Sequence, residues 1–241
     1  MNSAVRPLEG IKVVELSHMV LGPSCGLILA DLGADVVKVE PAPEGDKTRQ
    51  LPGSGSGYFG AFNRNKRSVA VDLKSTEGHK FAMKLVSGSD VLIENFGAGV
   101  LDRLGLGYDA MQKINPRLVY CALKGFLSGP YEHRAALDEV VQMMGGLAYM
   151  TGPEGRPLRA GTSVNDMLGA LFGAVAIQAA LWEREHTGKG TFVRSGLFET
   201  NMFLIAQHMV QFRQTGVPAV PMPERESAWA IYDVFETARG E

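Results

Sequence analysis

The sequence is poor in cysteine: Cys25 and Cys121 are the only two among 241 residues, and their spacing suggests neither a metal site nor a redox pair. Two isolated cysteines fit a reducing compartment. A formal net charge of −2 leaves no excess of basic residues to attract nucleic acid or an anionic membrane. The opening residues, MNSAVRPLEG, lack the apolar core of a signal peptide. We therefore expect a soluble, cytoplasmic protein with no nucleic-acid or membrane partner.

Several binding and catalytic motifs are also missing. The first predicted strand is followed by SHMVLGPSCG, which has Gly22 and Gly26 but no G-x-G-x-x-G, so dinucleotide binding loses its main support. The sequence contains no P-loop lysine motif and no G-x-S-x-G elbow, which argues against simple ATP hydrolysis and against a serine hydrolase. The five histidines are scattered, and no pair has the spacing of metal ligands.

What the sequence does have is a regular alternation of β-branched runs and helical stretches. Such alternation is typical of βαβ units and a parallel sheet. It predicts an α/β protein with a Rossmann-like open parallel sheet and flanking helices. The predicted strands are 11–17, 35–40, 68–74, 90–95, 116–125 and 191–199, and the predicted helices are 22–34, 76–89, 137–149, the run after Asp166, and 200–216. Residues 41–68 are too rich in Gly, Pro and Ser for regular structure, which is typical of a loop that covers a site.

One carboxylate, Asp166, stands just before an apolar run from Met167 to Leu181. Gln178 interrupts this run, which is shorter than the roughly 20 residues needed to cross a bilayer, so we interpret it as a buried helix. An aspartate in this place is commonly an N-cap, because its oxygen accepts hydrogen bonds from free backbone N–H groups. The helix N-terminus also favours the charged form, and a partly desolvated carboxylate can attack an electrophilic carbonyl. The residues alone leave cap and nucleophile both open.

Three cations, Lys74, Arg103 and Lys124, follow or flank the carboxyl ends of predicted strands. Three at matching ends of one sheet are as consistent with a ligand that carries phosphate as with solvated surface charges. His18 also follows a strand, at the edge where open α/β sheets bind ligands.

Four long segments resemble the class III CoA-transferases, a family that includes formyl-CoA transferase, carnitine CoA-transferase and α-methylacyl-CoA racemase. They are PLEGIKVVELSHMVLGPSCGLILADLGADVVKVEPAPEGDKTR, FNRNKRSVAVDLKSTEG, VLIENFGAGVLDRLGLGYDAMQKINPRLVYCALKGF and NDMLGALFGAVAIQAALWEREHTGKG, which together cover about Leu8 to Leu204 in the family's order. The resemblance implies that residues 1–205 form the N-terminal part of a large Rossmann-like domain. Residues 206–241 would then be a linker and the beginning of a small domain. The end at Glu241 leads us to expect a chain truncated relative to the family, whose full-length members form interlocked homodimers.

The resemblance also implies site residues. The family's nucleophile is an aspartate at the head of a helix, and it aligns with Asp166. Pro41 stands where relatives can have arginine, which puts one adenine or phosphate contact in doubt. The implied CoA-lining residues are Val20, Leu21, Pro41, Val71, Asp72, Leu73, Lys74, Asn95, Phe96, Gly97, Arg103, Lys124, Gly125, Phe126 and Leu127.

The activity that the resemblance implies is transfer of CoA from an acyl-CoA to a small carboxylic acid, with both as substrates and no tightly bound cofactor. The racemase branch is the first alternative. It uses a histidine in a G-H-D sequence, whereas this chain has Leu137 before Asp138, and His133 lies out of register. Because leucine exchanges no protons, we favour the transferase over the racemase. A second alternative is a fragment that binds CoA without turnover.

Overall fold

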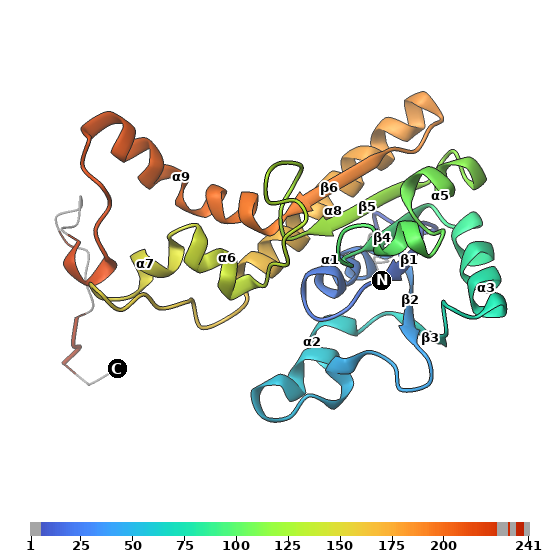
Figure 1. Ribbon diagram of the computed structural model, residues 1–241, viewed down its shortest axis with the longest axis horizontal. Coiled ribbons are helices and arrows are strands. Elements are labelled where there is room, and N and C mark those ends of the chain that lie inside the picture. Colours follow the sequence, from blue (N-terminus) through green and yellow to red (C-terminus); the bar gives the residue numbers. More distant parts are fainter. Residues whose placement is uncertain (1–5, 226–230, 232–234, 239–241) are drawn as a thin grey trace.

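The computed structural model describes residues 6–225, 231 and 235–238. Its centre is a six-stranded sheet in the order β3-β2-β1-β4-β5-β6, and every neighbouring pair is parallel (Figure 1). The strands are β1 (Lys12–Leu16), β2 (Asp35–Pro41), β3 (Arg67–Val71), β4 (Val91–Glu94), β5 (Val119–Lys124) and β6 (Phe192–Gly196). The predicted α/β class with an open parallel sheet is confirmed.

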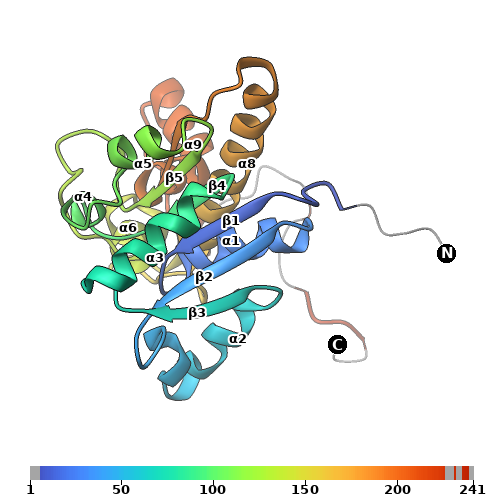
Figure 2. The same ribbon diagram turned by 90° about the vertical axis from the view of Figure 1, so that its right-hand side faces the viewer.

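Helices cover both faces of the sheet: in Figure 2, α3 lies in front of the strands and α1 behind them. Alternate strand residues serve the two faces: Val13 and Ile93 belong to the core under α1 and α8, whereas Val14 and Leu92 belong to the core under α3, α4 and α5. The helices are α1 (Leu21–Asp31), α2 (Tyr58–Asn63), α3 (Thr76–Ser87), α4 (Val100–Arg103), α5 (Tyr108–Ile114), α6 (Asp138–Met144), α7 (Leu147–Thr151), α8 (Val164–Thr187) and α9 (Leu197–Thr215).

Two predicted elements differ from those in the structure. The segment 41–68 was expected to lack regular structure, yet it contains α2 and two 3₁₀ turns, Lys47–Gln50 and Gly53–Gly57. Buried ion pairs hold this segment in place, a long-range effect that local composition does not reveal. The helix predicted for 137–149 is broken into α6 and α7, because Gly146 has a φ of +86°, which a right-handed helix excludes.

The long helix α8 is only half buried. Ala170, Ala174 and Ile177 are fully buried on its inner face. Val175 and Trp182, by contrast, are 55% and 72% exposed, so the prediction of a buried helix is wrong for its outer face. By length and composition, α8 is the single helix in the described part of the chain that would suffice to cross a membrane. Its packing on the sheet is that of a core helix in an α/β fold.

Beyond the sheet, α6, α7 and α9 form an arm that extends away from it (Figure 1). The strand predicted for 191–199 ends at Gly196, and α9 begins at the next residue. Helix α9 then continues to Thr215, so the domain boundary predicted after residue 205 lies within a continuous helix. Within the predicted linker and beginning of a small domain, residues 226–230, 232–234 and 239–241 lie outside the described residues.

Candidate active site

The strand order reverses between β1 and β4, and the loops that follow these two strands meet at the carboxyl edge of the sheet. The His18 backbone N–H donates to Asn95 Oδ1 at 2.9 Å, and Asn95 Nδ2 donates to the His18 carbonyl at 2.8 Å. The His18 ring lies edge-on to Phe96, with centroids 5.4 Å apart. Open α/β sheets bind ligands at such a switch point, because the diverging loops leave a crevice there. The structure thus joins His18 to two of the predicted CoA-lining residues.

Residues predicted to line the CoA site lie along this whole edge of the sheet. Val20 directly precedes α1, and Leu21 is its first residue. Pro41 and Val71 are register partners at the ends of β2 and β3, and Lys124 ends β5. Four strand spacings separate β3 from β5, which is about 19 Å at 4.8 Å per spacing. A ligand that touches both ends must therefore be extended, as CoA is.

Lys124 is already engaged in the structure. Its Nζ lies 2.6 Å from Glu94 Oε1 and donates to the Phe96 carbonyl at 2.7 Å. Burial is the main cause that raises the pKa of Glu94, and the contact with Lys124 opposes it. Lys124 would have to leave this ion pair with Glu94 to bind a phosphate. Lys74 and Arg103 are exposed and would not have to leave such a pair. A cavity of about 190 Å³ lies beside this ion pair, and its lining includes Gly97, Lys124 and Phe126.

Asp166 lies at the head of α8, close to the start of α1. A Cβ built on Gly169, one turn further along α8, would lie 3.1 Å from Leu21 Cδ1. This close packing of α8 on α1 brings the first turn of α8 near Leu21, one of the residues predicted to line the CoA site. Asp166 is the third residue of the helix, and Ser163 occupies the N-cap position without a side-chain hydrogen bond. The interpretation of Asp166 as the N-cap is therefore wrong.

The cap of α8 comes instead from another helix. Asp138, the first residue of α6, accepts hydrogen bonds on Oδ2 from the backbone N–H groups of Asn165 at 2.7 Å and Asp166 at 3.0 Å. Gln142 Nε2 donates to the other oxygen of Asp138, and Gln142 Oε1 accepts from Ala160 N at 2.8 Å. Asp138 is 3% exposed. The sequence analysis aligned Asp138 with the aspartate of the G-H-D sequence but assigned it no role; a further signal was the glutamine four residues later in the predicted helix.

Burial raises the pKa of Asp166 to about 7, with repulsion from Asp138 and Glu139 adding to the effect. The expectation that the helix N-terminus keeps Asp166 charged is therefore wrong, because the charge of Asp138 takes the N–H groups that would have stabilised it. Among the described residues, none donates a hydrogen bond to the Asp166 carboxylate. Near neutral pH this carboxyl group is therefore less readily ionised than an ordinary surface aspartate.

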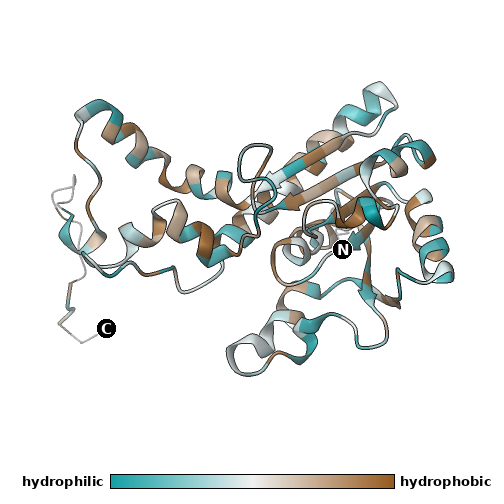
Figure 3. Ribbon diagram, viewed as in Figure 1, coloured by the Kyte–Doolittle hydropathy of each residue, from teal (hydrophilic) through white to brown (hydrophobic). Residues whose placement is uncertain are grey.

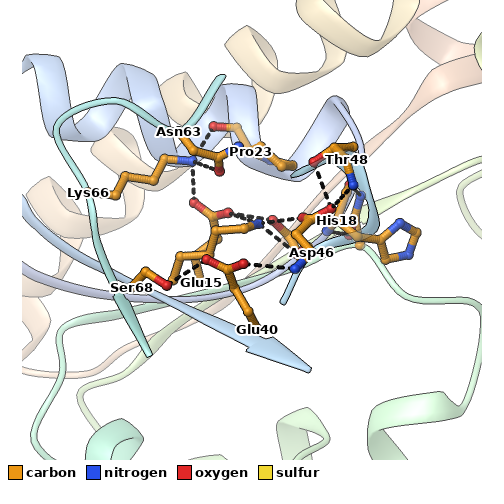
Figure 4. Close-up of polar contacts among 12 residues, drawn as sticks. Glu15, His18, Pro23, Glu40, Asp46, Thr48, Asn63, Lys66 and Ser68 are labelled. Carbon is orange, nitrogen blue, oxygen red and sulfur yellow. Dashed lines mark hydrogen bonds and ion pairs between the residues drawn. The ribbon is translucent and has the colours of Figure 1, made fainter. Parts of the chain in front are cut away.

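A second group of buried charges lies under the loop after β1 (Figure 4). Glu15 is fully buried, and its two oxygens lie 3.1 Å from Lys38 Nζ and 2.7 Å from Lys66 Nζ. Lys38 also pairs with Asp46 at 3.0 Å and donates to the Ser17 carbonyl at 2.9 Å. A Cβ on Gly26 would lie 2.0 Å from Glu15 Oε2, so this position of α1 requires glycine.

This ion-pair network fixes the segment 41–68 against the site. Burial alone would raise the pKa of Glu40, yet bonds from Arg49 and Ser68 hold it at about 2. Burial is also the main cause that lowers the pKa of His18, which Asp46 opposes and Lys38 reinforces. The sequence offered no spacing rule to identify these partners, since they come from separate strands and loops.

Comparison with known proteins connects the chain to a family. The family model described as CoA-transferase family III matches residues 8–241. An acetyl-CoA:oxalate CoA-transferase of Acetobacter aceti is 39% identical over 236 residues, which are 95% of this chain and 61% of that protein. A formyl-CoA:oxalate CoA-transferase of Streptomyces coelicolor is 46% identical over 190 residues, which are 77% of this chain and 46% of that protein.

Solved structures agree with the sequence relatives. A CAIB/BAIF family protein from Brucella suis matches with a TM-score of 0.85 and 41% identity, over 90% of this chain and 60% of that one. The chain spans 55% to 62% of the length of the first three curated relatives that it matches.

Proposed function

Because this chain belongs to CoA-transferase family III, we propose that it carries the nucleophile and the CoA-binding edge of an enzyme that moves CoA from an acyl-CoA to a free carboxylic acid. The observation that supports this most directly is Asp166: a partly buried carboxylate without a hydrogen-bond donor among the described residues, at the end of the switch-point crevice. A carboxylate of raised pKa is a stronger nucleophile than an ordinary surface aspartate.

The first half of the reaction forms and then consumes an anhydride. The ionised carboxylate of Asp166 attacks the thioester carbonyl, the C–S bond breaks, and CoA leaves as a thiolate. The product is a mixed anhydride between Asp166 and the donor acid. The thiolate then attacks the aspartyl carbonyl, which releases the donor acid as a carboxylate and leaves an aspartyl-CoA thioester. No proton is gained or lost overall.

The second half repeats these steps in reverse with the acceptor. The acceptor carboxylate attacks the aspartyl carbonyl and expels the CoA thiolate, which gives a second mixed anhydride. The thiolate attacks the acceptor's carbonyl, forms the new acyl-CoA and restores the Asp166 carboxylate. Backbone N–H groups at each oxyanion would contribute about 3 kcal/mol apiece. The aspartyl-CoA thioester is close in energy to the substrate thioester, and each anhydride lies above it, so no intermediate is a deep trap.

The substrates proposed here are an acyl-CoA and a small carboxylic acid. The names of the relatives supply a first panel: acetyl-CoA with oxalate, formyl-CoA with oxalate, and succinyl-CoA with glutarate. CoA is a substrate in this proposal, and its extended length suits residues that are spread from Pro41 and Val71 to Lys124.

The test is to incubate the protein with each donor and acceptor pair and to follow the new acyl-CoA by mass spectrometry. We expect transfer with at least one pair, and loss of transfer in Asp166→Ala. Transfer that persists in Asp166→Ala would overturn the assignment of the nucleophile. Exchange of the α-proton of a branched acyl-CoA with deuterium, without transfer, would favour the racemase reaction instead.

We further propose that the full-length protein is an interlocked homodimer. Apolar residues occur along the arm and along α8 (Figure 3), and those that are exposed support association with further protein. Val175, Trp182, Phe203 and Phe212 are each more than half exposed. Exposed apolar surface on this scale ordinarily marks an interface. Light scattering on the full-length protein should give the mass of a dimer, and mixed labelled and unlabelled dimers should not exchange subunits without unfolding.

A further inference from the structure

Two acidic residues of like charge are held together at the head of α8, although bringing them together costs free energy. Asp138 is 3% exposed, and both of its oxygens are occupied: Oδ2 by two backbone N–H groups and Oδ1 by Gln142. One of those N–H groups belongs to Asp166 itself. A buried carboxylate thus binds the backbone N–H of the residue that the proposed function needs as its nucleophile.

We propose that Asp138 is a positioning residue for Asp166: its buried carboxylate clamps the first turn of α8 so that the Asp166 side chain faces the incoming thioester without a hydrogen-bond donor of its own. The proposal rests on the proposed function, since it assigns a role relative to that nucleophile. It adds a second, non-nucleophilic carboxylate to the active site.

Capping alone does not require this arrangement. Ser163 already stands at the N-cap position, where a serine oxygen ordinarily accepts from the first turn, and it makes no such bond. A neutral oxygen would satisfy the same N–H groups. A carboxylate from a second helix does so while placing a negative charge beside Asp166, which raises the free energy of the ionised nucleophile and makes it more reactive toward a carbonyl.

A neighbouring side chain, Gln142, holds the Asp138 carboxylate in place. Gln142 lies one turn after Asp138 on α6 and is fully buried, and it also holds Ala160, in the segment that leads into α8. Glutamine is neutral, so it fixes the Asp138 carboxylate without cancelling its charge. A lysine or arginine in its place would have formed an ion pair with Asp138 and offset its negative charge.

The charged groups around Asp166 can be named element by element. From α6, Asp138 and Glu139 face it, and Arg159 pairs with Glu139 at 3.5 Å. The first turn of α1 has no charged residue. From α9, Glu199 accepts a hydrogen bond from the Leu127 N–H at 3.1 Å. Among these groups, Asp138 alone is bonded to the Asp166 backbone.

The test compares the protein with Asp138→Asn, with Gln142→Met and with the control Asp109→Asn, which removes an exposed carboxylate from α5. The titration of Asp166 is followed by NMR of protein labelled with ¹³C at aspartate Cγ, with Asp166→Asn to assign the signal. This readout does not depend on activity, so it stands even if the proposed function fails. We expect Asp138→Asn to lower the titration midpoint of Asp166 by on the order of one pH unit. Asp109→Asn should leave it unchanged.

The same proteins are then assayed with acetyl-CoA and oxalate across pH. Asp138→Asn should move the acid limb of the rate profile by the same amount as the NMR midpoint. Gln142→Met keeps the charge but loosens the clamp, so the midpoint should stay near 7 while the rate falls roughly tenfold. An unchanged midpoint in a folded Asp138→Asn protein would overturn the proposal. If Asp138→Asn does not fold, full activity in Gln142→Met would overturn it.

Discussion

The protein buries carboxylates in two places, and the two differ in what surrounds them. Glu15 is fully buried beside the ammonium groups of Lys38 and Lys66, and the Ser17 hydroxyl donates to it at 2.7 Å. Asp166 is partly buried beside Asp138, with no cation bonded to it among the described residues. Buried charges that form ion pairs hold the fold in place. A buried carboxyl group beside another carboxylate has a raised pKa and is more reactive.

The difference extends to how each region responds to pH. Glu40 in the ion-pair network has a pKa of about 2 because of Arg49 and Ser68, in spite of burial. Its contribution to stability is present above its unfolded pKa and is lost as the pH falls through about 2. Asp166 has a pKa of about 7, so its contribution is present at low pH and is lost as the pH rises through that value.

The largest effect on the rate of CoA transfer is expected from a change at Asp166, which has no ion-pair partner among the described residues. Asp166→Asn removes the nucleophile while keeping the shape of the side chain, so the rate of CoA transfer should fall by at least roughly 10³-fold. Mass-spectrometric assay of acyl-CoA products measures this loss. Circular dichroism should show a folded protein, because Asp166 makes no side-chain hydrogen bond on which the described fold depends.

Removal of one partner from the paired region should affect stability most. Lys66→Met leaves the buried Glu15 with one ion-pair partner, Lys38, which Asp46 also shares, and should lower the free energy of unfolding by about 3 kcal/mol. Urea denaturation measures the change. The control is Arg64→Met: Arg64 pairs with Asp31 at the surface, its side chain is 55% exposed, and the loss should be below about 1 kcal/mol. Equal losses in the two variants would remove the distinction between the regions.

The opposite signs of the pH dependence sharpen the comparison. Glu40→Gln should destabilise the protein by about 2 kcal/mol at pH 7, and by progressively less as the pH falls from about 4.5 to about 2. Asp166→Asn should stabilise it by about 2 kcal/mol above pH 7, with the gain vanishing below pH 4. Thermal or urea unfolding across pH measures both. Curves that run in the same direction would contradict the assignment of the two regions.

The smallest effect is expected from Asn95, at the switch point of the sheet between β1 and β4. Asn95→Ala removes both hydrogen bonds that join the loops after β1 and β4, at a cost of about 1 to 2 kcal/mol in stability. Since those loops line the proposed CoA crevice, KM for acyl-CoA should rise more than kcat falls. A change in kcat alone would place Asn95 nearer to the chemistry than the proposed function has it.

Much of the fold follows from local patterns. The β-branched runs predict all six strands of the sheet, and the Gly residues after α8 and α9 mark their ends, since Gly188 and Gly216 adopt positive φ. The order in segment 41–68 did not follow, because it depends on ion pairs with distant residues, and the break at Gly146 did not follow, because glycine also occurs inside helices. The sequence pattern identified Asp166, but its surroundings were not predictable, since Asp138 reaches it from another helix.

The central claim is that Asp166 becomes covalently bonded to an acyl group during turnover. The most direct measurement is a peptide map of protein mixed with acetyl-CoA and quenched with hydroxylamine. Hydroxylamine converts an aspartyl anhydride or thioester to a hydroxamate of distinct mass. The account predicts that this label lies on the peptide that contains Asp166 and that Asp166→Asn abolishes it. A label on any other residue, with Asp166 unmodified, would contradict it.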